Sequence, residues 1–270
     1  LDEAFKQCTA EAEMSFGQGA VFVEQFVQRA RHVEIQVLGD GTNVTHLHER
    51  DCSVQLRNQK MVEIAPCRGM HPELRNRMTS CAVRLSKEVN YSGAGTLEFL
   101  VVGGDVSKAD TQFVFLEMNP RIQVEHTITE CITGIDLVAA QLRIAQFGKS
   151  LAALNLNQNQ IPEPQGCAVQ LRVTLLPGPV ALKKYQEPSG PGIRVDTGIY
   201  EGCTLSMEFD PMVSKLIIHE PSGNWDQCVE KSLDALTNYI IEGPNTNKHW
   251  VERILQHDEM KNNTIATCFM

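Results

Sequence analysis

The 270-residue sequence lacks the features that mark several special classes of protein. Its nine cysteines include no C-x-x-C pair, which excludes a disulfide scaffold and the common zinc-ligand spacings and predicts reduced thiols in an intracellular compartment. No apolar run approaches the roughly 18 residues of a membrane-spanning helix. Neither a glycine-rich phosphate loop nor an internal repeat occurs. The chain therefore has the composition of an ordinary folded protein.

Positive charge is also in short supply. The sequence has 24 Lys+Arg against 33 Asp+Glu, a formal net charge of −9. This balance argues against generic binding to a nucleic-acid backbone or an anionic membrane. With 42% hydrophobic and 21% charged residues, the chain is globular and long enough for one large or two ordinary domains. We expect neither nucleic acid nor membrane among its partners.

Hydrophobic periodicity predicts both helices and strands. The first helix begins with Asp2 as its cap and ends near Gly17. Further helices are predicted at 74–89, 135–147, 226–241 and 247–257. Strands are predicted at 21–27, 32–38, 44–48, 96–102, 113–118, 168–175 and 212–219. Because no regular βαβ alternation is present, we assign the chain to the α+β class.

A change of composition divides the chain in two. The segment 155–165 is rich in Asn, Gln and Pro, which is typical of a boundary. We expect one domain at 1–154 and a second at 166–270. The sequence begins without Met inside helix-like sequence, so we also expect a front part to precede it.

Alternating polar residues between 115 and 126 carry the strongest chemical signal. They are Glu117, Asn119, Arg121, Gln123 and Glu125. In an extended chain such residues share one face, and Pro120 excludes a helix here. The predicted hairpin brings Glu98 beside Glu117. Two carboxylates and an amide oxygen suit Mg²⁺ or Mn²⁺.

Each of these signals has a plainer explanation as well. The alternation also fits a half-solvated strand face, although Arg121 favours a site for a metal-bound polyphosphate, which needs both cations and anions. The segment 49–60 is either a solvated charge run or a source of the phosphate ligands Arg57 and Lys60. His32 either contacts phosphate or is an ordinary strand histidine.

Taken together, the motifs resemble the biotin carboxylase component of biotin-dependent carboxylases, the ATP-grasp enzymes that include pyruvate, acyl-CoA and urea carboxylases. The matching segments are 31–37, 49–55, 93–96, 117–126, 190–195 and 210–216, and the likeness covers essentially the whole chain. The resemblance implies an incomplete ATP-grasp domain followed by a biotin carboxylase C-terminal α+β domain. It also implies a ligase in which ATP and Mg²⁺ activate bicarbonate as carboxyphosphate, from which biotin is carboxylated.

The resemblance further implies roles for individual residues. The metal ligands would be Glu98, Glu117 and Asn119. Bicarbonate would be surrounded by Lys60, Arg121, Gln123 and the backbone N–H of Val124. The catalytic residues would be Glu125 as the base, Arg121 beside it, keeping it ionised, and Arg172, which would stabilise the biotin enolate. ATP would be bound by Glu24, Gln25, Phe26, Val27, His32, Gln55, Asn58 and Lys60.

The partners implied are a biotinylated carrier domain or protein, a carboxyltransferase component, bicarbonate and a second copy of the chain in a homodimer. The chain has no Ala-Met-Lys-Met-like biotinylation motif, so biotin would arrive as a carried substrate. We expect an intracellular location, in the cytoplasm, with the mitochondrial matrix as an open alternative.

Several departures from the family pattern predict weak or no activity for this chain alone. The Gly-rich lid is absent, Leu56 stands where the family usually has a second Arg, Gln170 replaces the more usual Glu, and a segment after Arg172 is skipped. These departures favour one alternative, an impaired remnant that binds nucleotide weakly or serves in dimerisation. A third hypothesis, an ATP-grasp ligase for another carboxylate and an amine, is weaker because residues 121–126 resemble the bicarbonate site in particular.

Overall fold

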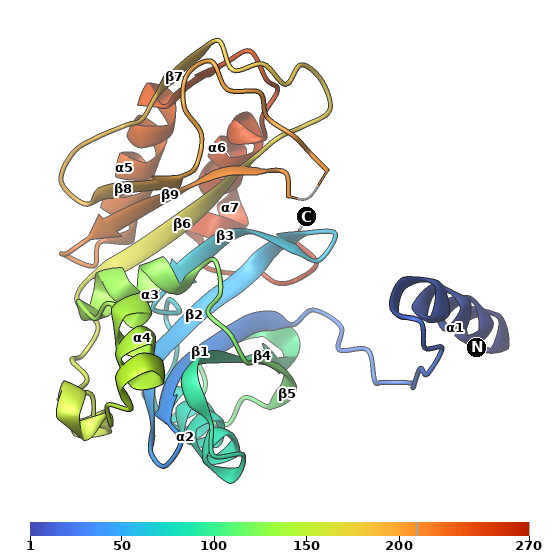
Figure 1. The fold of residues 1–270 in the computed structure, drawn as a ribbon, viewed down its shortest axis with the longest axis vertical. Coiled ribbons are helices and arrows are strands. Elements are labelled where there is room, and N and C mark those ends of the chain that lie inside the picture. The colour runs from blue at the N-terminus through green and yellow to red at the C-terminus, as the bar shows by residue number, and fades with distance from the viewer. Residues whose placement is uncertain (209, 270) are drawn as a thin grey trace.

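The computed structural model describes residues 1–208 and 210–269, and its centre is one eight-stranded antiparallel sheet (Figure 1). Along the sheet the strands follow the order β5-β4-β1-β2-β3-β6-β9-β8. Their bounds are β1 Arg31–Asp40, β2 Val44–Leu56, β3 Gln59–Ala65, β4 Ser92–Val101, β5 Phe113–Asn119, β6 Cys167–Thr174, β8 Ile193–Thr197 and β9 Met212–Glu220. Two short strands, β7 (Lys184–Gln186) and β10 (Ile240–Glu242), form a separate pair. The mixture of sheet and helices confirms the α+β class.

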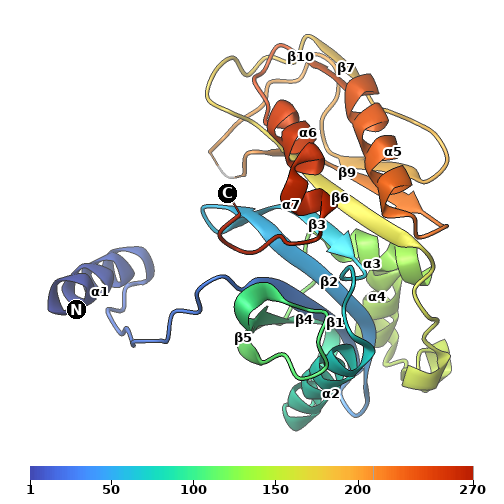
Figure 2. The same cartoon turned by 180° about the vertical axis from the view of Figure 1, so that it is seen from behind.

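Helices cover both faces of this sheet (Figures 1 and 2). One face carries α2 (Pro72–Glu88), α5 (Trp225–Asn238) and α6 (Lys248–Gln256), with the short α7 (Asp258–Lys261) following. The other face carries α3 (His126–Thr133) and α4 (Leu137–Phe147). The sheet is therefore the middle of three layers.

Side-chain alternation within each strand decides which residues meet which helices. In β6, Val169 and Leu171 belong to the apolar cluster that contains the buried residues of α5 and α6. Between them, Gln170 points the other way and accepts a hydrogen bond of 2.7 Å from Thr127 of α3. The same alternation places the polar residues of neighbouring strands on the α3 face. A polar patch thus forms near the start of α3.

The predicted helices are all present, and most of the predicted strands are found. Two local predictions are wrong. Residues 21–27 form no strand, because no neighbouring strand pairs with this segment in the part of the chain that the structure describes. Asp2 does not cap the first helix, α1 (Asp2–Phe16); Leu1 is the N-cap residue and Asp2 lies in the first turn.

The predicted boundary falls in a segment with two short 3₁₀ turns, η2 (Ala152–Leu154) and η3 (Gln158–Gln160). Strand β6, which follows this segment, pairs with β3, which precedes it. One sheet therefore runs through both parts of the chain, and the division into two domains stays a prediction. Among the described residues, no helix has the length and apolarity that a membrane crossing requires.

Helix α1 lies apart from the rest of the molecule in both views (Figures 1 and 2), joined to β1 by residues 17–30. None of its residues is buried, and Phe16 is 84% exposed. The other end of the chain is held closely instead. Asn263 accepts a hydrogen bond of 2.5 Å from the buried Arg31, and its amide donates to the Arg68 carbonyl at 2.9 Å. Stability therefore depends on the C-terminal segment and not on α1.

We predict that brief tryptic digestion will remove α1 and most of the segment before β1 without lowering the thermal midpoint by more than about 2 °C, because this segment buries almost no apolar surface. Mass spectrometry and calorimetry of the trimmed chain provide the measurement. The contrasting variant is Asn263→Ala, which leaves buried Arg31 short of a partner and loses about 1–3 kcal/mol of unfolding free energy. A trimmed chain that melts at least as early as this variant would contradict the account.

Candidate functional site

Every residue that the sequence analysis assigned to the site lines a single cleft of about 1000 Å³. These residues are Glu24, Gln25, Phe26, Val27, His32, Gln55, Asn58, Lys60, Glu98, Glu117, Asn119, Arg121, Gln123, Val124, Glu125 and Arg172. They come from the segment before β1, from β1 to β6, and from the loop between β5 and α3. The cleft opens on the face of the sheet that carries α3.

The centre of the cleft is the ammonium group of Lys60. Its Nζ lies 2.6 Å from Glu34 Oε2, 2.6 Å from Glu125 Oε1 and 3.0 Å from Glu98 Oε1. The Lys60 side chain is only 12% exposed, and the three carboxylates are buried. One cation therefore holds together three carboxylates that come from β1, β4 and the start of α3.

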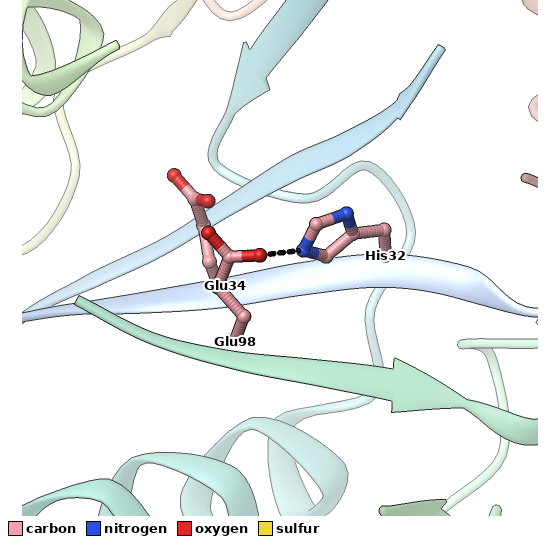
Figure 3. A group of neighbouring side chains, drawn as sticks. All are labelled: His32, Glu34 and Glu98. Atoms are coloured by element: carbon pink, nitrogen blue, oxygen red, sulfur yellow. Dashed lines mark ion pairs between the residues drawn. The ribbon is translucent and has the colours of Figure 1, made fainter. Parts of the chain in front are cut away.

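Strand pairing creates the need for this cation. Glu34 of β1 is directly opposite Glu98 of β4 in the sheet, and like charges in such a pair repel each other. Figure 3 shows the two carboxylates side by side with His32. Besides Lys60, the fully buried guanidinium of Arg50 offsets this charge, with Nε 2.5 Å from Glu34 Oε1.

Arg50 also connects the strands to the loop and to α3. Its remaining hydrogen bonds reach oxygens of Gln36 (2.6 Å), Thr129 (2.9 Å), Thr96 (3.2 Å) and Gln123 (3.4 Å). Because these partners belong to β1, α3, β4 and the loop before α3, the guanidinium fixes their relative positions. Such a buried cation requires good hydrogen-bond geometry to repay its loss of hydration.

His32 is fixed in one tautomer by its two neighbours. Gln55 Nε2 lies 2.5 Å from His32 Nδ1, and His32 Nε2 lies 2.7 Å from Glu98 Oε2 (Figure 3). An amide N–H donating to Nδ1 leaves the proton on Nε2, where it faces the carboxylate. His32 Nε2 thus lies against Glu98 at ion-pair distance, and the ring is placed beside one of the predicted metal ligands.

These contacts shift the pKa values of the central groups. Burial raises the pKa of Glu98, but the close contact with His32 and the charge of Lys60 outweigh it and lower the pKa to about 2. For Glu34, the charges of Arg50 and Lys60 likewise outweigh burial and lower the pKa to about 2. Burial lowers the pKa of Lys60, but the surrounding carboxylates raise it above its usual value. These groups are therefore ionised at neutral pH.

Glu125 is held between two cations, but Arg121 is not one of them. Its Oε1 meets Lys60, and its Oε2 lies 3.0 Å from Nη2 of Arg172. The predicted neighbour, Arg121, is exposed and donates to the Ile122 carbonyl at 3.1 Å. The extended conformation assumed for this segment ends at Asn119, the last residue of β5, and Glu125 is the N-cap residue of α3. Lys60 and Arg172 therefore take the place predicted for Arg121 beside Glu125.

Arg172 is also held by a second carboxylate, that of Glu63 on β3. Its Nε donates to Glu63 Oε1 at 2.5 Å, and Glu63 Oε2 accepts a 3.1 Å hydrogen bond from Gln170. The register explains the contact, because Gln170 is directly opposite Glu63 in the β6–β3 pair. Arg172 therefore lies inside the cleft although the segment after it is skipped. A carboxylate replacing Gln170 would lie against that of Glu63.

The predicted metal ligands converge as expected. Glu98 and Glu117 are opposite each other in the β4–β5 pair, and the Asn119 amide lies between them, 3.1 and 3.0 Å from their oxygens. Turning that amide brings its oxygen toward both carboxylates, which gives the oxygen ligands that Mg²⁺ prefers. The buried groups His32–Glu34–Glu98 and Glu34–Cys52–Glu125 also have metal-like spacing, but the Lys60 ammonium bridges the carboxylates in both.

The remaining predicted residues form the rim of the cleft. Glu24, Gln25, Phe26 and Val27 lie in the segment before β1, where Phe26 is 85% exposed. Asn58, at the β2–β3 turn, has a positive φ of 63°. Leu56, which stands where the family usually has an Arg, packs against the apolar cluster around α5.

Four residues that hold the others in place were not predicted from the sequence: Glu34, Arg50, Glu63 and Lys215. A signal was present for some of them, because Glu34 and Arg50 lie in the quoted segments 31–37 and 49–55, and Lys215 lies in 210–216. Nothing in the sequence alone separates them from ordinary strand residues, since their contacts come from strand pairing.

Comparisons with known proteins agree with this geometry. The family model of the carbamoyl-phosphate synthase L chain, ATP binding domain, matches residues 1–154, and that of the biotin carboxylase C-terminal domain matches residues 170–270. The chain belongs to the biotin carboxylase family. This confirms the resemblance noted in the sequence.

Two relatives and one solved structure show how far the likeness extends. Pyruvate carboxylase of Aspergillus niger is 41% identical over 279 residues, and human mitochondrial pyruvate carboxylase is 39% identical; each match covers 100% of this chain and 23% of the relative. The biotin carboxylase domain dimer of Hydrogenobacter thermophilus 2-oxoglutarate carboxylase, solved with MgADP, ADP and bicarbonate, has a TM-score of 0.90 at 35% identity. That match covers 99% of this chain and 58% of the other.

The buried carboxyl of Glu63 should make the unfolding free energy depend on pH. Burial raises its pKa to about 7 despite the opposing charge of Arg172. A carboxyl that binds its proton more tightly in the folded state stabilises the fold fully below the unfolded pKa of about 4.5, and that contribution is lost as pH rises through about 7. Between pH 5 and 8, the unfolding free energy of the unsubstituted chain should therefore fall on the order of 2 kcal/mol further than that of Glu63→Gln.

Urea unfolding across this pH range is the measurement. The matched control is Glu88→Gln, at an exposed position near the end of α2, which should follow the unsubstituted chain. Parallel profiles for Glu63→Gln and the unsubstituted chain would show that Glu63 does not titrate in this range.

Proposed function

We propose that this chain takes part in the ATP- and Mg²⁺-dependent activation of bicarbonate as carboxyphosphate and in the carboxylation of biotin. The observation that carries the proposal is the position of Glu125, a buried carboxylate between Lys60 and Arg172 in the same cleft as the Glu98, Glu117 and Asn119 patch. This arrangement supports a base and an anion site beside a set of metal ligands.

The chemistry requires this combination. Bicarbonate is a poor nucleophile, so Glu125 removes its proton while Lys60, Arg121, Gln123 and the Val124 N–H hold the anion. The bicarbonate oxygen then attacks the terminal phosphorus of ATP, and ADP leaves. The carboxyl group passes from carboxyphosphate to the ureido nitrogen of biotin as inorganic phosphate leaves, and the proton of that nitrogen goes to the released phosphate. The guanidinium of Arg172 stabilises the enolate form of biotin.

The nucleotide extends from the metal-ligand patch toward the rim. Glu98, Glu117 and Asn119 hold Mg²⁺ or Mn²⁺, which neutralises charge on the phosphates when bound. His32, Gln55, Asn58 and Lys60 lie along the nucleotide, and the segment Glu24–Val27 meets the adenine. The shared cleft and the MgADP and bicarbonate named for the Hydrogenobacter thermophilus domain support these assignments.

Biotin reaches the cleft on a biotinylated carrier domain or protein, and a carboxyltransferase component uses the carboxylated product. We further propose that the chain acts inside the cell and pairs with a second copy as a homodimer. The name of the Hydrogenobacter thermophilus domain dimer supports the pairing, and the pyruvate carboxylase relatives support the carrier and transferase steps.

The chain on its own turns over slowly at best. Residues 24–27 line the cleft but are mostly exposed, and phosphates in contact with water are stabilised far less by nearby charge than enclosed ones. The alternative function is therefore an impaired module that binds nucleotide weakly or serves in dimerisation.

Calorimetric titration with MgADP tests the nucleotide site, using Glu117→Gln as the variant. We expect binding by the unsubstituted chain and a loss of affinity of about tenfold or more in the variant, because a metal ligand is removed. Glu88→Gln is the exposed control and should bind as the unsubstituted chain does. Equal MgADP affinity in all three chains would contradict the assigned metal ligands.

Bicarbonate-dependent ADP release with free biotin tests the reaction itself. A low rate that requires bicarbonate supports the proposed reaction. Nucleotide binding without any such release favours the impaired module, and turnover that continues without bicarbonate would indicate a ligase for another carboxylate.

A further inference from the structure

Two cations from neighbouring strands hold two successive residues of the loop before α3. Arg172 of β6 and Lys215 of β9 are directly opposite each other in the sheet. Arg172 Nη2 lies 3.0 Å from Glu125 Oε2, and Lys215 Nζ donates to the Val124 carbonyl at 2.9 Å. Lys215 is only 9% exposed. This lysine therefore contacts the loop that carries the proposed base and anion donor.

Lys215 is itself held in place from the opposite side. Its Nζ lies 3.2 Å from Asp196 Oδ2, on the neighbouring strand β8. Arg194 donates to both oxygens of Asp196, at 2.7 and 3.0 Å, and reaches Glu130 of α3 at 3.2 Å. The ammonium group thus belongs to an ion-pair network on β8 and α3. Its fixed position therefore sets the direction of the Val124 carbonyl.

The Val124 carbonyl needs such a partner. The carbonyls before and after that of Val124 accept backbone hydrogen bonds from α3. The Gln123 carbonyl accepts from His126 N at 3.2 Å, and the Glu125 carbonyl accepts from Ile128 N at 3.3 Å. His126 Nδ1 also lies 2.8 Å from the Gln123 carbonyl. With Gln123 held by His126 and Val124 held by Lys215, both peptide planes that flank the Val124 Cα are fixed, and with them the direction of the Val124 N–H.

We propose that Lys215 is a positioning residue that keeps the Val124 carbonyl turned away from the cleft and the Val124 N–H turned toward a bound bicarbonate-like anion. The inference rests on the proposed function, because it assumes that an anion binds at this N–H. A carbonyl released into the cleft would present its negative end to that anion and repel it. Lys215 therefore sets the affinity for the anion without touching it.

The test is a bicarbonate titration of ¹⁵N-labelled protein saturated with MgADP, followed through the Val124 amide resonance at constant pH and ionic strength. We expect saturable shifts in the unsubstituted chain and bicarbonate affinity at least about tenfold lower in Lys215→Met, with MgADP affinity unchanged. Lys215→Arg, which keeps the cation, should restore most of the affinity. If Lys215 had only a structural role, Lys215→Met would lower the affinities for bicarbonate and MgADP together.

Two further variants complete the design. Asp196→Asn keeps Lys215 but weakens the ion pair that holds it, so the affinity for bicarbonate should fall, by less than in Lys215→Met. This variant also provides the test if Lys215→Met fails to fold. Lys231→Met is the control and should change neither affinity. Lys231 lies outside the cleft, and its Nζ is 2.6 Å from Glu220 Oε2.

Bicarbonate affinity within about twofold of the unsubstituted chain in both Lys215→Met and Asp196→Asn would overturn the role of Lys215. A different failure would count against the proposed function. If the unsubstituted chain binds MgADP but shows no bicarbonate shift, the anion site is wrong and the role of Lys215 is wrong with it.

Discussion

The ammonium group of Lys60 is the interaction on which the rest of the site depends. Antiparallel pairing places Glu34 directly opposite Glu98, and α3 brings Glu125 to the same point. Three buried carboxylates at hydrogen-bond distance from one atom repel each other strongly unless a cation is present. With Lys60 in the middle, and Arg50 beside Glu34, the repulsion becomes an attraction that joins β1, β3, β4 and the start of α3. The cleft has its shape because this charge is balanced.

The second half of the chain supplies further cations around the cleft. Arg172 reaches Glu125 from β6 while Glu63 holds it from behind, and Lys215 reaches the Val124 carbonyl from β9. Both cations lie on the α3 face because alternate residues of their strands pack against α5 and α6. The apolar pattern that builds the core thus also aims the polar residues into the cleft. Fold and site follow from one alternation.

Much of this was predictable from the sequence. Helix and strand periodicity located most elements, and the segments 49–60 and 115–126 contained the central lysine, two of the three predicted metal ligands and the proposed base. The failures have physical causes. Residues 21–27 have strand-like composition but pair with no strand among the residues that the structure describes. Glu125 begins a helix instead of continuing a strand, so Arg121 lines the cleft without pairing with Glu125. Contacts such as that of Glu63 with Arg172 depend on register, which one sequence does not reveal.

The most direct test of the account is the unfolding free energy of Lys60→Met at two pH values. Removing the cation leaves buried carboxylates uncompensated, so the variant should lose about 3–5 kcal/mol at pH 8. The loss should be smaller at pH 5, because carboxyls whose pKa values rise without Lys60 take up protons in the folded state and are stabilised as pH falls. A loss below about 1 kcal/mol at pH 8, or one that does not change with pH, would contradict the claim that Lys60 holds the site together.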